Sequence, residues 1–169
     1  MIYRIRVTAY TDKGHVFRDI ETDSSVNLED LNNVIQQSFG LDGMEMASFY
    51  TLDDELNTLD EIPLFPMEEG KTVSMDKVRL EEVLNPDQPK LAYVYDYMNM
   101  WQFLVELLEQ SEDEDVRLET PQVVYSKGQL PDEPPQIQFD IKNIDEIFDD
   151  DLENFRDDFD EYYDPDEWE

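Results

Sequence analysis

The sequence predicts an α+β fold, in which a mixed or antiparallel sheet carries one main helix and is followed by an acidic C-terminal tail. Apolar and polar residues alternate over residues 2–9 and again over 15–21, as they do in half-buried strands. Apolar residues recur at helical spacing over residues 28–39. Residues 140–169 hold 15 acidic and 2 basic side chains, so this segment alone carries a formal charge of -13.

The first elements follow directly from these patterns. Thr11-Asp12-Lys13-Gly14 forms a turn between the two alternating runs, which predicts an N-terminal β-hairpin. Asp23-Ser24-Ser25 offers capping groups for the helix that follows, and Gly40 is a favourable stop. The apolar positions of this helix are Leu28, Leu31, Val34, Ile35 and Phe39.

The middle of the chain predicts a third strand, a loop, a short helix and a fourth strand. These lie at residues 46–52, 53–71, 76–84 and 91–97. Residues 101–110 fit both periods, because Trp101, Leu104 and Leu108 suit a helix whereas Trp101, Phe103 and Val105 suit a strand. Residues 122–125 predict a last short strand.

The proline-rich segment 129–135 reads as a linker, so we expect an α+β domain at residues 1–135 and a separate tail at 136–169. Apolar residues recur in the tail at intervals of mostly three or four, which is typical of one face of an amphipathic helix. Exposed aromatic residues favour aggregation, so we expect these to dock on the domain or on a partner. The candidate partner-binding residues are Phe148, Phe155, Phe159, Tyr162, Tyr163 and Trp168, with Asp157 and Asp158 beside them.

The overall charge limits the classes of partner. The 169 residues include 44 acidic and 12 basic side chains, a formal charge of -32. Such a protein repels nucleic acid and anionic lipid and is attracted to basic surfaces. We therefore expect no direct binding to nucleic acid or membrane. The first six residues begin a strand pattern and no run of about 18 apolar residues occurs, which favours a soluble, cytoplasmic protein.

No pattern for catalysis or for a cofactor stands out. The chain has no cysteine, and its five glycines form no phosphate-binding loop. The single histidine, His15, follows a predicted turn with no recognisable catalytic neighbours, so a surface position is expected. The carboxylate runs, such as Asp53-Asp54-Glu55 and Asp149-Asp150-Asp151, lack the glycine of a calcium loop. We expect no cofactor and no metal.

The aromatic residues of segment 91–101 leave two readings open. Tyr93, Tyr95, Tyr97 and Trp101 could form a platform for a base or a sugar. A platform for nucleic acid needs a basic groove, and the basic residues are scattered along the chain. We therefore expect a sheet face packed under the helix.

Four blocks within residues 1–135 resemble the plasmid-Ri open-reading-frame-three-like family, which is also described as passenger proteins of insertion elements. They are the opening strand pair, the helix 28–40 followed by Phe49-Tyr50, the segment 78–84, and the segment 91–97 leading into Trp101. The resemblance implies an α+β fold with strand pairing across residues 91–110, and it implies no particular function.

The chain also departs from the family pattern. Met98-Asn99-Met100 replaces a Gly-Asp-Gly turn, and Met44, Glu45 or Met46 stands where the family has a histidine. The family's cysteine- and glycine-rich ending is reduced to residues 130–135. A polar site built from those elements would be missing in this chain.

The function expected from these features is that of a non-enzymatic interaction protein. Its acidic surface and tail would bind a basic protein that belongs to a nucleic-acid-handling machine such as RNA polymerase, a transposase or the ribosome. One alternative is a DNA-mimic inhibitor, in which carboxylates stand in for phosphates. Another is a carboxylate-based hydrolase or metal-dependent enzyme.

Overall fold

The computed structural model describes residues 1–11, 14–65, 73–112 and 120–133. Within these ranges, seven strands form one sheet in the order β4-β3-β5-β6-β1-β2-β7, and each neighbouring pair is antiparallel. The α+β class is therefore confirmed, and the described sheet is antiparallel rather than mixed. The strands are β1 (Ile2–Thr11), β2 (Gly14–Asp23), β3 (Ala47–Leu52), β4 (Thr58–Pro63), β5 (Lys90–Tyr95), β6 (Trp101–Ser111) and β7 (Gln122–Lys127).

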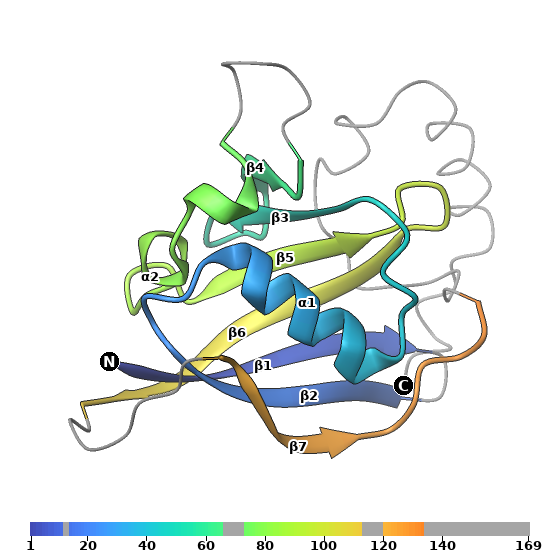
Figure 1. Cartoon of the computed structure of the whole chain (residues 1–169), viewed down its shortest axis with the longest axis horizontal. Coiled ribbons are helices and arrows are strands. Elements are labelled where there is room, and N and C mark those ends of the chain that lie inside the picture. Colours follow the sequence, from blue (N-terminus) through green and yellow to red (C-terminus); the bar gives the residue numbers. More distant parts are fainter. Residues whose placement is uncertain (12–13, 66–72, 113–119, 134–169) are drawn as a thin grey trace.

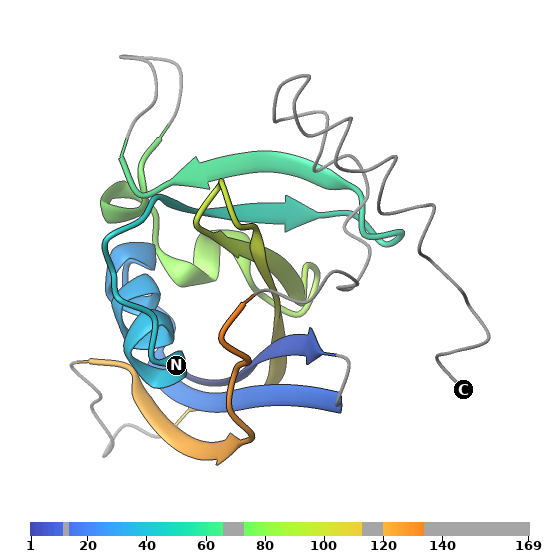
Figure 2. The same cartoon turned by 90° about the vertical axis from the view of Figure 1, so that its right-hand side faces the viewer.

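The helix α1 (Leu28–Phe39) packs on one face of this sheet (Figures 1 and 2). We call this the inner face and the opposite one the outer face. The cap of α1 is Asn27, whose side chain accepts a hydrogen bond from the Asp30 amide at 2.8 Å, rather than the expected Asp23-Ser24-Ser25. Asp23 instead accepts hydrogen bonds from the backbone amide and the hydroxyl of Ser25, before the helix begins. Gly40 ends the helix as expected, with φ at 74°.

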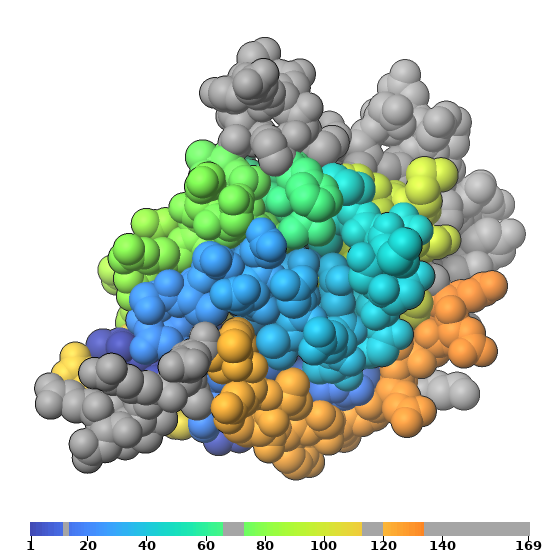
Figure 3. Space-filling model, in the orientation of Figure 1, coloured from blue at the N-terminus to red at the C-terminus, as the bar shows by residue number. Residues whose placement is uncertain are grey.

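The main core lies between α1 and the inner face. Its fully buried members alternate along the strands, as Ile5 and Val7 do on β1, because successive side chains of a strand point to opposite faces. Leu28, Leu31 and Ile35 supply the apolar stripe of α1. Figure 3 shows this side of the molecule, with α1 at its centre and β7 running beside it.

Two expectations for the middle of the chain need correction. The segment 53–71 was expected to be a loop, but its residues 58–63 form β4, which pairs with β3. A tight turn makes this possible: Asp53 accepts hydrogen bonds from the amides of Glu55 and Asn57. The short helix expected over residues 76–84 is divided into a 3₁₀ turn, η1 (Met75–Lys77), and α2 (Leu80–Val83), because the chain between them is extended.

Residues 101–110 belong to β6, as the family resemblance implies, and β6 pairs with β5 and with β1. Trp101, Phe103 and Val105 face α1, whereas Leu104 points to the outer face. Both faces of this strand carry apolar residues. The helical and strand periods therefore fitted the same sequence equally well.

The described chain ends just after β7. Residues 128–133 form neither helix nor strand, but Leu130 packs against the main core, so this segment is more than a linker. Figures 1 and 2 show it rising from β7 along the end of the sheet where β1 stops and β2 starts. Among the described residues, no helix has the length and apolar character needed to cross a membrane.

Candidate functional site

The outer face of the sheet has an apolar half that was not foreseen from the sequence. All six residues of β3 are buried, and so are five of the six in β5, which means that both strands are buried on both faces. The outer-face side chains form a second cluster beside the main core. We call it the apolar half, and it consists of Tyr50, Leu52, Ala92, Val94, Met100 and Leu104.

Polar groups occur at the margin of the apolar half. The Tyr50 hydroxyl donates a hydrogen bond to Glu61 at 2.6 Å, and the hydroxyls of Ser48 and Tyr97 bond to one another. Burial, reinforced by the hydrogen bond to Glu61, raises the pKa of Tyr50 well above its ordinary value. Burial also raises the pKa of Tyr97. These hydroxyls thus stay protonated and act as fixed hydrogen-bonding groups rather than as bases.

The other half of the outer face carries arginines and aromatic rings. Arg6 lies over the Phe17 ring at 4.1 Å and forms two hydrogen bonds to Asp19, at 2.8 and 3.1 Å. Arg4 reaches the same carboxylate at 3.5 Å. Tyr125 stacks on Phe17 with ring centroids 5.7 Å apart. The ammonium group of Lys127 also lies over the Phe17 ring, at 5.9 Å.

The turn of residues 96–100 connects β5 to β6 and contains the Met98-Asn99-Met100 that stands in place of the family's Gly-Asp-Gly. Asp96 and Met100 have φ at 63° and 60°, a conformation that costs little only for glycine and, to a lesser degree, for Asn and Asp. The buried Asp96 carboxylate offsets this cost, since it accepts hydrogen bonds from the amides of Met98 and Asn99. Met100 meanwhile buries its side chain in the apolar half. The Asp96 carboxylate and the buried Met100 side chain thus stabilise a turn that contains no glycine.

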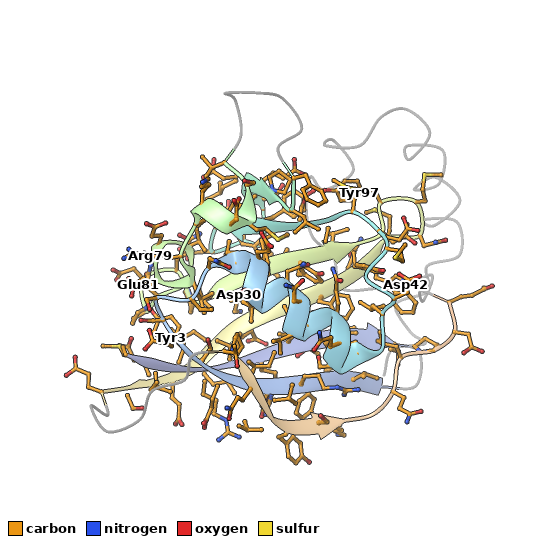
Figure 4. All side chains as sticks on the ribbon, viewed as in Figure 1. Tyr3, Asp30, Asp42, Arg79, Glu81 and Tyr97 are labelled. Atoms are coloured by element: carbon orange, nitrogen blue, oxygen red, sulfur yellow. The ribbon has the colours of Figure 1, made fainter. Side chains whose placement is uncertain are left out.

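The inner-face tyrosines hold the helix to the sheet. Tyr93 is fully buried and donates a hydrogen bond to the side-chain oxygen of Asn32 at 2.6 Å. Gln36 donates to both of these residues, at 2.9 and 3.1 Å. Tyr95 bonds to Asp42, which follows the end of α1 (Figure 4). Tyr93, Tyr95 and Trp101 therefore pack under the helix, as expected, and form no open platform. The same expectation is wrong for Tyr97, which follows the end of β5 and packs against the outer-face cluster.

The remaining candidates from the sequence fall into two groups. His15 is exposed at the start of β2, where its ring contacts Tyr10 edge-on at 4.3 Å. The proposed partner-binding residues lie outside the described residues; they are Phe148, Phe155, Asp157, Asp158, Phe159, Tyr162, Tyr163 and Trp168. In the part of the chain that the structure describes, no three acidic or histidine side chains are grouped as metal ligands.

One signal in the sequence could have revealed the apolar half. Strands buried on both faces show continuous apolar runs instead of alternation. Residues 91–95 and 47–52 contain such runs, broken only by hydroxyl-bearing and small side chains.

The comparisons with known proteins concern family and fold. The structure is similar to a crystal structure of a protein of unknown function from Methanosarcina mazei Go1, with a TM-score of 0.65 and 19% identity over 97% of this chain and 92% of that one. No curated protein matches the chain. The family model matches residues 1–169, so the match extends past residue 135, where the resemblance described above stops. The chain belongs to the family of Plasmid pRiA4b ORF-3-like proteins.

Proposed function

We propose that this protein is a non-enzymatic interaction protein that binds a basic protein partner through its acidic surface and C-terminal segment. The partner class that fits best is a component of a nucleic-acid-handling machine, such as RNA polymerase, a transposase or the ribosome. Such components present basic surfaces to nucleic acid, and an acidic protein is drawn to them by the same charge.

The observation that carries this proposal is the charge of the described surface. In the described ranges, 14 acidic side chains are exposed, compared with four basic ones. The acidic character is therefore a property of the folded domain and not only of the segment 140–169. The exposed acids occur at both ends of α1, with Asp30 and Glu81 near its start and Asp42 near its end (Figure 4).

Three of the arginines are engaged within the fold. Arg4 and Arg6 bind Asp19, and Arg18 donates to the backbone carbonyls of Ser38, Phe17 and Lys127. These cations neutralise little of the exposed negative charge. A basic partner would meet a surface of largely one sign, which favours fast, salt-dependent association.

Affinity needs desolvated anchors as well as charge, because exposed ion pairs contribute about 0–1 kcal/mol each. We assign that role to the aromatic residues Phe148, Phe155, Phe159, Tyr162, Tyr163 and Trp168, with Asp157 and Asp158 adding charge. This part of the proposal rests on the spacing of the residues in the sequence.

The described carboxylates give less support to a carboxylate-based enzyme. Such an enzyme needs an acid or base whose pKa is raised by burial. The two buried carboxylates have structural partners: Asp19 binds Arg4 and Arg6, and Asp96 caps a turn. Asp23 and Asp42 have pKa values lowered by hydrogen bonds, Asp23 from Ser25 and Asp42 from Tyr95.

The test has two steps. The tagged full-length protein is used to isolate its partner from cells that contain it, and the purified pair is then titrated at low and at high salt. We expect a basic partner whose affinity falls with salt. A neutral or acidic partner, or binding that salt leaves unchanged, would contradict the proposal.

A competition experiment separates this proposal from DNA mimicry. Saturating duplex DNA is added to the complex of the protein with its partner. Ordinary docking predicts a ternary complex, whereas a DNA mimic would be displaced.

A further inference from the structure

The apolar half of the outer face is buried more deeply than the described elements explain. Tyr50, Ala92 and Val94 are 0% exposed, and Leu104 is 6% exposed. None of the described helices contributes a residue to this cluster. The described side chains that pack on it from outside are Tyr10, Leu56 and Tyr97, which come from β1, from the turn between β3 and β4, and from the turn after β5.

In an antiparallel sheet that is covered by one helical layer, the second face is ordinarily exposed to water and carries polar side chains. The β3–β5–β6 part of the outer face does the opposite, since it presents a tyrosine, a methionine and branched aliphatic side chains. A sheet that is apolar on both faces needs a third layer that covers the second face.

We propose that this third layer is the chain's own C-terminal segment, residues 134–169, and that its aromatic side chains pack on the apolar half. The segment has 36 residues and follows directly from Glu133. A helix of about 20 residues is about 30 Å long, which is close to the width of seven strands at about 4.8 Å spacing. The segment is therefore long enough to cross the sheet.

Charge favours the outer face over the rest of the surface. Strand register assigns four of the seven basic residues in the described ranges to this face and six of the 22 acidic ones. They are Arg4, Arg6, Lys90 and Lys127 against Asp19, Glu21, Asp23, Glu61, Glu106 and Glu109. A segment with a charge of -13 over residues 140–169 meets least repulsion where the surface carries the smallest excess of negative charge.

The family match also favours a C-terminal segment that belongs to the domain. It covers residues 1–169, so the C-terminal segment lies within the matched length instead of following it.

This inference goes beyond the proposed function and places a condition on it. The aromatic residues assigned to partner binding are the ones that would occupy the outer face. A partner that uses them would have to displace them from the sheet.

The native chain has no cysteine, which permits a direct test by thiol labelling in the full-length protein. Ala92→Cys places a thiol in the apolar half, and Ala47→Cys places a matched thiol on the inner face, where Ala47 is also 0% exposed. Each is labelled with a small thiol reagent, alone and combined with Phe155→Ala and Phe159→Ala. No partner is present in the experiment.

We expect both thiols to label slowly in the otherwise unchanged chain. The aromatic substitutions should accelerate labelling of Ala92→Cys about tenfold or more and leave Ala47→Cys unchanged, because only the outer face would be opened locally. A second variant replaces six of the segment's aromatic residues with alanine and should label faster still; these are Phe148, Phe155, Phe159, Tyr162, Tyr163 and Trp168.

Four results would overturn the inference. Rapid labelling of Ala92→Cys in the unsubstituted background, or no acceleration in the six-alanine variant, would show that the segment does not cover the face. Equal acceleration of both thiols would place the aromatic residues in the main core. Protection that is lost on dilution would identify a second copy of the chain as the occupant. Since no partner is needed, each of these results leaves the proposed function to be judged by its own titration.

Discussion

Ala92 and Tyr93 are neighbours on β5 whose side chains point to opposite faces of the sheet, yet both are fully buried. Tyr93 lies under α1, where Asn32 and Gln36 bind its hydroxyl. Ala92 lies on the outer face, in a cluster that contains no residue from a described helix. The inner face is thus covered by a helix, whereas the outer face is equally buried without one among the described residues.

The hydrogen bonds of Tyr93 should contribute measurably to stability. Tyr93→Phe keeps the ring but removes the hydroxyl that bridges Asn32 and Gln36 in a fully buried site. Loss of one partner from such a site typically costs about 1–3 kcal/mol. Urea unfolding should show a loss in this range, and the exposed Tyr125→Phe should change the free energy of unfolding by less than about 0.5 kcal/mol.

The turn at residue 100 should reverse the usual preference between alanine and glycine. Met100→Ala and Met100→Gly both lose the buried side chain, but only glycine relieves the positive φ of 60°. We expect the glycine variant to be more stable than the alanine variant by about 1 kcal/mol, since the left-handed conformation costs other residues about 1–2 kcal/mol. Thermal unfolding of the two proteins side by side measures the difference. Equal midpoints would show that the turn relaxes on truncation.

The Asp42–Tyr95 pair should set part of the stability at low pH. The hydrogen bond from Tyr95, with help from the Met44 amide, lowers the pKa of Asp42. A lowered folded-state pKa stabilises the fold above the ordinary Asp value of about 3.9, and this contribution is lost as the pH falls through the folded-state value. Carboxyl NMR titration should show the pKa of Asp42 rising in Tyr95→Phe. The hydrogen bond also helps burial raise the pKa of Tyr95 to about 12.

Removal of the tail should weaken the domain without abolishing its fold. The sequence predicts that a chain ending at Pro135 folds, because the periodic strands and helix precede that point. We expect one cooperative thermal transition at a lower midpoint than in the full chain, together with binding of a hydrophobic dye to the uncovered outer face. Loss of the cooperative transition would show that residues 136–169 are part of the core.

Local patterns identified the elements whose two faces differ in polarity. The hairpin β1–β2 and the helix α1 have one apolar and one polar side, and their periods gave nearly correct bounds. β6 was ambiguous because apolar residues occupy both of its faces. β4 was missed because four of its six residues are partly or fully exposed, and its pairing with β3 depends on a turn that Asp53 organises.

The candidate site was harder to foresee than the fold. The apolar half combines residues from β3, β5, β6 and the turn at residue 100, which are brought together by strand order alone. The Arg6–Asp19 pair likewise depends on the register of β1 against β2. Neither arrangement is visible without the pairing of the strands. The tail aromatics are predicted from their spacing alone and lie outside the described residues.

The central claim, that aromatic anchors on an acidic protein bind a basic partner, is tested most directly by two matched double variants. Phe155→Ala with Phe159→Ala removes two anchors, and Asp157→Asn with Asp158→Asn removes two neighbouring charges. Binding of each to the purified partner is titrated at two salt concentrations. We predict that the aromatic pair costs more, about 2 kcal/mol or more for a true hot spot, and that only the loss from the acidic pair shrinks at high salt. An equal or smaller loss from the aromatic pair would contradict the account and leave the tail as a diffuse polyanion.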